Sequence, residues 1–113
     1  FGYKNGLPMD ADLVFDVRFL PNPYWNEDLK DLTGNDKPVY DYVIEKKETQ
    51  RFIKKLKSFL DYAFKEYIRE GKNHFTVAIG CTGGKHRSVS LVNWAYENYG
   101  KEYRCFKDHR DLE

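Results

Sequence analysis

Residues 74–100 read HFTVAIGCTGGKHRSVSLVNWAYENYG and predict a strand, a glycine-rich loop and a helix in direct succession. The run 74–80 is short, apolar and rich in β-branched and aromatic residues, as in a buried parallel strand. From Ser88 onward, apolar residues recur at helical spacing until Gly100, and Ser88 is a suitable N-cap. The stretch therefore indicates an α/β fold in which a loop joins a strand to a helix N-terminus.

The rest of the chain is expected to form the strands and helices that pack against the segment 74–100. Residues 12–20 indicate a strand, because aromatic and β-branched residues dominate them and Pro21 follows. Residues 49–70 indicate a long amphipathic helix that ends at Gly71. Shorter elements are expected as a helix or turn at 26–32, a helix at 37–44 with Asp36 as cap, and a strand at 103–106. Because strands alternate with helices, we expect a small, mostly parallel sheet with helices packed on it.

Length and composition fit one domain spanning residues 1–113, which we interpret as a fragment of a longer protein. A hydrophobic content of 41% suffices for a core, and no apolar run approaches the roughly 18 residues of a membrane span. A net charge of +1 argues against a nucleic-acid binder with a global positive field. Two cysteines form neither a disulfide framework nor a zinc pattern, which favours the cytoplasm, and we predict no metal and no cofactor.

The glycine-rich loop is predicted to bind phosphate or another anion. Glycines at positions 80, 83 and 84 expose backbone N–H groups where the dipole of the following helix is positive. Lys85, His86 and Arg87 add positive charge, and Thr82 and Ser88 add hydroxyl groups. The predicted ligand-binding residues are Asp16, Arg18, Tyr24, Cys81, Thr82, Gly83, Gly84, Lys85, His86, Arg87 and Ser88.

The strand at 12–20 is expected to bring two charged residues close to the glycine-rich loop. Its alternation puts Phe15, Val17 and Phe19 on one face and Asp16 and Arg18 on the other. If this strand and the strand before Cys81 are parallel, their carboxyl ends meet at one edge, where ligands bind in open α/β sheets.

Three interpretations of the loop remain open from these residues alone, and the first is the anion-binding loop described above. A Walker A loop is excluded, because Gly80 stands too close to Lys85 and His86 follows the lysine. Cys81, followed after five residues by Arg87 and Ser88, matches the C-x5-R-[ST] pattern of tyrosine-phosphatase-like loops, with Asp16 as candidate general acid. The third interpretation is a helix cap in which Cys81 is only a packed residue.

Three segments, residues 10–23, 33–38 and 77–88, closely resemble the C-terminal domain of the RapZ family, and the resemblance extends over nearly the whole chain. It implies a fold similar to part of the phosphofructokinase architecture. In that family the domain accompanies an N-terminal P-loop domain. In the best-known branch of the family it senses glucosamine-6-phosphate, binds a small regulatory RNA and presents it to an endoribonuclease.

The resemblance also implies roles for residues of this chain. It implies an amino-sugar-phosphate pocket lined by Asp16, Arg18, Cys81, Thr82, Gly83, His86 and Arg87, and RNA contacts at Lys4, Lys85 and Arg87. Tyr24 stands where the family often has a histidine. We therefore expect a non-catalytic sensing domain for a phosphorylated small molecule. Its expected partners are RNA, an endoribonuclease or another protein, and other copies in a full-length oligomer. A cysteine-dependent phosphatase and an RNA adaptor without a small ligand are the alternatives.

Overall fold

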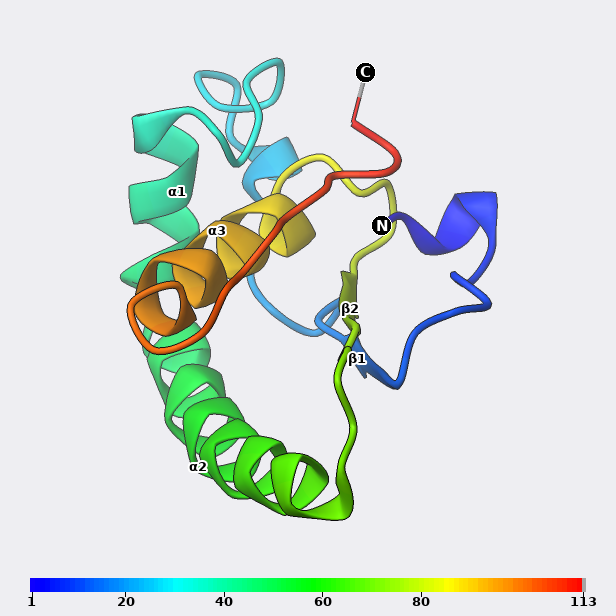
Figure 1. The fold of residues 1–113 in the computed structure, drawn as a ribbon. Helices are drawn as coiled ribbons and strands as arrows, with labels where there is room; N and C mark the ends of the chain where they lie inside the picture. The colour runs from blue at the N-terminus through cyan, green and yellow to red at the C-terminus, as the bar shows by residue number, and fades with distance from the viewer. Residues whose placement is uncertain (113) are drawn as a thin grey trace.

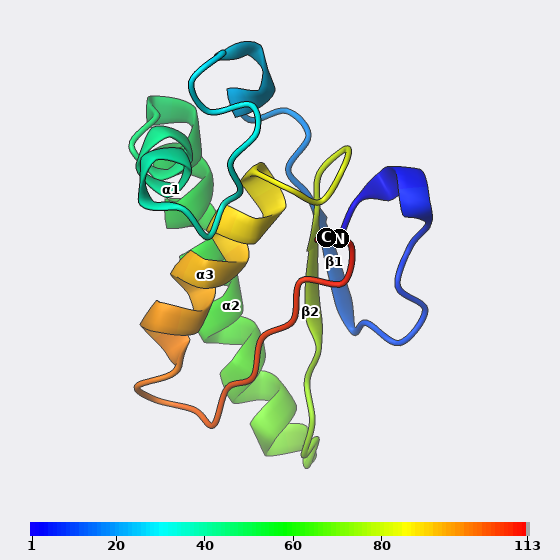
Figure 2. The same cartoon turned by 90° about the horizontal axis from the view of Figure 1, so that it is seen from above.

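The computed structural model describes residues 1–112, and Glu113, the last residue of the chain, lies outside the described residues. Its helices are α1 (Lys37–Ile44), α2 (Lys47–Glu70) and α3 (Arg87–Tyr99), and its strands are β1 (Leu13–Asp16) and β2 (Val77–Gly80). Two short 3-10 helices, η1 (Tyr3–Asn5) and η2 (Pro23–Trp25), complete the elements. The three helices lie on one side of the strands (Figures 1 and 2), so the predicted α/β class is confirmed.

The two strands are parallel, as predicted. Leu13 pairs with Val77 and Asp16 pairs with Gly80, so both strands end at the same edge of the sheet. The N-terminal segment lies along the other edge of β2, because Gly2 forms an isolated parallel bridge with Cys81. The amide of Tyr3 donates to the carbonyl oxygen of Cys81 at 2.8 Å. The sheet thus brings the chain's first residues against the start of the glycine-rich loop.

The first strand is shorter than predicted. Its last ladder bond runs from the amide of Val17 to the carbonyl of Gly80 at 2.9 Å, and the amide of Leu20 then bonds back to Val17 in a turn. Because the chain turns there, Phe19 leaves the predicted core face and is 65% exposed. Val17 remains fully buried, so the alternation was correct only up to the turn.

Two other predictions are decided by local hydrogen bonding. Residues 26–32 form turns and not a helix, with the amide of Leu29 bonded to Asn26. The predicted strand at 103–106 is wrong: the amide of Tyr103 bonds to Tyr99 and prolongs the turn after α3, while the edge of β2 is taken by Gly2. Tyr103 and Cys105 pack instead on the core between α2 and α3.

The long helix follows the predicted apolar stripe. Ile53, Leu56, Leu60 and Ala63 are buried along α2, and Gly71 ends it in the left-handed conformation at φ +94°. One core cluster joins the sheet to α1 and α3, with Val17, Leu20, Val39, Ile79 and Leu91 among its members. A second cluster, Leu56, Leu60 and Tyr99, joins α2 to α3. The helices therefore hold β2, and with it the loop, from one side.

The C-terminal segment returns along β2 to the N-terminus, as Figure 2 shows. Asp111 accepts a hydrogen bond from the amide of Gly2 at 2.7 Å, and Arg110 donates to the carbonyl of Gly6 at 2.6 Å. Upstream, Lys107 and His109 both bond to the side-chain oxygen of Asn93 in α3, at 2.8 and 3.1 Å. Both ends of the chain therefore pack beside the glycine-rich loop.

Gly84 is a point of close backbone packing with a positive φ angle, and it gives a first prediction. It lies at φ +74°, and a Cβ there would stand 2.6 Å from the amide nitrogen of Gly2. We expect Gly84→Ala to lower the free energy of unfolding by roughly 2–4 kcal/mol, from backbone strain and overpacking together. Gly71→Ala, at φ +94° with open space around it, should lose only about 1 kcal/mol. Urea unfolding measures both, and equal losses would contradict the close approach.

Asp111 gives a prediction about pH. The hydrogen bond from Arg110 is the main reason that the pKa of Asp111 falls to about 2, from 3.8, against the opposing effect of burial. A lowered pKa stabilises the fold above the unfolded value, and this stabilisation is lost as pH falls. Asp111→Asn should therefore lower the free energy of unfolding by about 1 kcal/mol near neutral pH.

The difference between Asp111→Asn and the parent should shrink as the pH falls from about 4 to about 2. Asp108→Asn, an exposed change in the same segment, is the matched control and should leave stability unchanged. Unfolding measured across this pH range tests the assignment, and a difference that does not depend on pH would refute it.

Candidate functional site

Arg87, the first residue of α3, is a buried cation at the centre of the site. Its side chain is only 4% exposed. Nη1 donates to the carbonyl oxygens of Arg18 and Leu20 at 2.6 and 3.1 Å, and Nη2 reaches the hydroxyl of Thr82 at 3.4 Å. Nε is buried without a hydrogen-bond partner, and Arg87 forms no ion pair within residues 1–112. A buried positive charge without a counter-ion favours binding of an anion.

Asp16 and Arg18 lie beside the loop as a charged pair. The Arg18 guanidinium donates to Asp16 through Nε at 3.0 Å and Nη2 at 2.6 Å, and it stacks 3.8 Å above the ring of Tyr3. The hydrogen bond from Arg18 is the main cause that lowers the pKa of Asp16. The two side chains remain 42% and 47% exposed, so both can meet a ligand from solvent.

Cys81 lies beneath the loop and not on its surface. Its side chain is 2% exposed, its Sγ lies 3.2 Å from the hydroxyl of Ser88, and the Ser88 amide donates to Sγ at 3.4 Å. Burial raises the pKa of Cys81, but hydrogen bonds from Ser88 and from the Gly84 amide, with the charge of Arg87, outweigh it, and the net pKa is lowered. The surroundings of Cys81 thus favour a thiolate that solvent does not reach.

The N-cap prediction for Ser88 is wrong. The helix begins at Arg87, and His86 is its N-cap residue without a side-chain capping bond. The hydroxyl of Ser88 contacts Cys81 instead, because Ser88 is already inside the helix and its side chain points toward β2.

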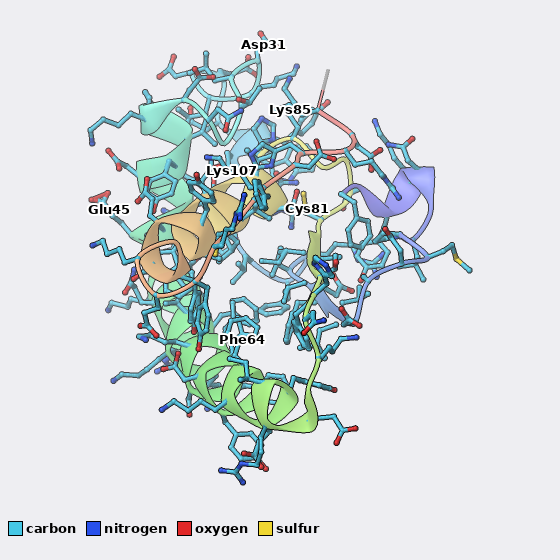
Figure 3. All side chains as sticks on the ribbon, in the orientation of Figure 1. Asp31, Glu45, Phe64, Cys81, Lys85 and Lys107 are labelled. Carbon is cyan, nitrogen blue, oxygen red and sulfur yellow. The ribbon has the colours of Figure 1, made fainter. Side chains whose placement is uncertain are left out.

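Lys85 and His86 turn toward a neighbouring segment. Lys85 Nζ and His86 Nε2 both approach the carbonyl oxygen of Lys30, at 3.2 and 3.1 Å. Burial is the main cause that lowers the pKa of His86, which is 6% exposed, so its ring is neutral near neutral pH and presents Nε2–H to that carbonyl. Figure 3 shows Cys81 at the end of β2 and Lys85 further along the loop, toward the turn that carries Asp31.

The predicted site residues thus fall into two groups. Contacts join Asp16, Arg18, Cys81, Thr82, Arg87 and Ser88 directly or through the backbone. Lys85 and His86 bond to the carbonyl oxygen of Lys30 and so join the loop to the turn at residues 26–32. Tyr24 lies near the same turn, because its ring centre is 5.4 Å from Lys30 Nζ. Lys4 lies against the loop, with its Nζ 3.9 Å from the position of a Cβ on Gly83. Whether these residues bind a ligand stays a prediction.

Sequence reasoning missed Tyr3 and the carbonyl groups of Arg18, Leu20 and Lys30. Tyr3 reaches the site only because the N-terminal segment pairs with Cys81. The carbonyl groups belong to the backbone, so no residue type marks them in a sequence.

None of the helices described in residues 1–112 combines the length and apolar character needed to cross a bilayer.

Comparison with known proteins places this site in a large group of relatives. The family model described as RapZ C-terminal domain matches residues 1–113. A nucleotide-binding protein of Thermoanaerobacter sp. (strain X514) is 55% identical over 113 residues, which are 99% of this chain and 40% of that protein. A nucleotide-binding protein of Bacillus pumilus is 53% identical over 100% of this chain and 38% of its own length. The chain therefore spans about two fifths of the length of these curated relatives.

The surroundings of Cys81 give a prediction about its acidity. Because the Ser88 hydroxyl helps to lower the pKa of Cys81, Ser88→Ala should raise that pKa. The pH dependence of thiol alkylation, measured in a Cys105→Ser background, reports it. Ser90→Ala is the matched control, since the Ser90 hydroxyl donates to the carbonyl of His86 and not to Cys81. An unchanged inflection in Ser88→Ala would show that the hydroxyl does not stabilise the thiolate.

Proposed function

The chain belongs to the RapZ C-terminal domain family, and from that premise we propose that its loop 81–88 binds the phosphate group of a small phosphorylated molecule, a sugar or amino-sugar phosphate. The observation that carries the proposal is the Arg87 guanidinium, 4% exposed, with an unpartnered Nε and no ion pair in residues 1–112. A bound phosphate would supply the missing counter-charge and accept a hydrogen bond from the Nε–H group of Arg87.

The helix supports the same ligand. The N-terminus of α3, a helix of 13 residues, carries no side-chain cap from His86. Apart from the Ser88 amide, which donates to Cys81 Sγ, its first amides and its dipole remain available to an anion. The Thr82 hydroxyl, exposed to solvent and near Arg87, adds a donor at the mouth of the loop.

The charged pair beside the loop supports a sugar as the remainder of the ligand. Asp16 offers carboxylate oxygens to hydroxyl or ammonium groups, and Arg18 offers further donors, while both stay partly exposed. The ring of Tyr3 extends this surface under Arg18. The name of the curated relatives refers to nucleotides, which also carry phosphate, but residues 1–113 contain no Walker A pattern.

Coupling to a macromolecule follows from shared residues. Lys4 is exposed and lies against Gly83, so an RNA phosphate at Lys4 would approach the mouth of the loop. If RNA and the small ligand both need Arg87, each weakens binding of the other by the same factor. The domain would then act as a sensor that releases RNA, or a protein partner, when the ligand is present.

A phosphatase is the second candidate, and the lowered pKa of Cys81 favours it. An attacking thiolate must reach the phosphorus, however, and Cys81 is 2% exposed beneath Ser88. This candidate therefore requires the loop to open so that the phosphorus can reach Sγ.

A two-dimensional amide NMR titration with inorganic phosphate and glucosamine-6-phosphate tests the proposal. We expect saturable chemical-shift changes at the amides of residues 82–88 with both ligands. The amides of Asp16 and Arg18 should shift with the sugar phosphate only. Arg87→Lys keeps the positive charge but loses the planar set of guanidinium N–H donors, and it should weaken binding by about tenfold or more. Thr82→Val, at an exposed position, should weaken it less.

Arg104→Lys is the matched control, because Arg104 is exposed and its guanidinium lies 5.7 Å from the centre of the Phe106 ring, away from the loop. It should bind phosphate as the parent does. An absence of shifts in the loop with either ligand would overturn the proposal. Hydrolysis of an aryl phosphate that is lost in Cys81→Ser would support the phosphatase instead.

A further inference from the structure

The outer edge of β1 is open. The amides of Leu13 and Val17 donate to Thr76 and Gly80 at 3.2 and 2.9 Å, which sets the phase of the ladder. Because successive residues of a strand point their N–H groups in opposite directions, the amides of Val14 and Asp16 point away from β2. The main chain of these two residues bonds to no other described segment, and Val14 is 42% exposed.

One flank of α2 lies beside this edge and extends beyond it. Phe59 contacts Phe15 of β1 at a ring distance of 6.1 Å, and Phe52 contacts Phe19 just after β1 at 5.6 Å. On the same flank lies a surface hollow of about 470 Å³ lined by Lys54, Lys55, Ser58, Phe59 and Tyr62. A third strand on the edge of β1 would lie over this hollow, because adjacent strands are about 4.8 Å apart and α2 already supports β1.

The hollow is apolar at its base and positively charged. Phe59 and Tyr62 are 44% and 66% exposed there. Lys54 and Lys55 form no ion pair within residues 1–112, whereas the two aspartates that flank β1 are neutralised, Asp12 by Lys72 and Asp16 by Arg18. A segment bound here would therefore meet uncompensated positive charge on the helix and bare N–H and C=O groups on the strand.

We propose that the edge of β1 and the adjoining flank of α2 form a docking groove for an extended, acidic peptide segment of a partner protein, which adds to the sheet as a third strand. Its main chain pairs with Val14 and Asp16. On the face toward α2, apolar side chains rest on Phe59 and Tyr62, and carboxylates approach Lys54 and Lys55. The sheet of two strands gains a third strand.

The groove is separate from the anion site. It uses the outer edge of β1 and the flank of α2, whereas phosphate binding uses the loop after β2 and the start of α3. Asp16 is common to both proposals, through its main chain in the groove and through its carboxylate in the sugar contact. The phosphate and the peptide share no other residue, and failure of one proposal leaves the other standing.

The test uses an acetylated peptide with the repeat Val-Thr-Glu-Thr, which places valine and glutamate on the same face of a strand, titrated into the chain and followed by amide NMR and hydrogen exchange. We expect saturable binding with slowed exchange at the amides of Val14 and Asp16. The same peptide N-methylated at every second residue cannot complete the ladder and should not bind. Lys54→Glu with Lys55→Glu should weaken binding by about tenfold.

The matched control for the charge reversal is Lys101→Glu with Arg104→Glu, an equal change at exposed residues after α3. It should bind the peptide as the parent does. Equal binding of the corresponding peptide with lysine in place of glutamate, or unprotected amides at Val14 and Asp16, would overturn the proposal. Protection of these amides at rising chain concentration without peptide would assign the edge to a second copy of the chain instead.

Discussion

The buried guanidinium of Arg87 joins the parts of this domain that matter for its function. It fixes the first residue of α3 to the turn after β1 through the carbonyl oxygens of Arg18 and Leu20, and it reaches Thr82 across the loop. These bonds stabilise a charge that is 4% exposed without an ion pair in residues 1–112, yet leave one N–H free. The carbonyl groups of the turn thus receive hydrogen-bond donors, while the positive charge of Arg87 stays without a counter-ion and is available to the proposed ligand.

The other contacts of the loop hold its shape. Gly2 and Tyr3 pair with Cys81 on one side, Lys85 and His86 bond to Lys30 on another, and Ser88 meets Cys81 beneath. Two segments distant in sequence, together with Ser88 of the loop itself, thus support one short loop. Binding energy then need not be spent on ordering the loop, which is the advantage of a preformed site.

The same sheet leaves one edge covered and one edge open. The N-terminal segment covers β2, where the anion site lies, while β1 keeps bare main-chain groups beside the aromatic and lysine side chains of α2. The covered edge adjoins the proposed anion site, and the open edge is the one proposed to take an extended polypeptide. The two proposals thus use opposite edges of one sheet.

The sequence by itself determined the α/β class, the parallel direction of the strands, all three helices and the meeting of Asp16 with the glycine-rich loop, because periodicity and glycine placement are local properties. Tertiary structure alone decided that β1 ends at Asp16, that Ser88 faces Cys81, that residues 103–106 form no strand and that Lys85 and His86 turn to Lys30. The physical reason is that these outcomes depend on backbone carbonyls and strand edges contributed by distant segments, and such groups are the same in every residue type.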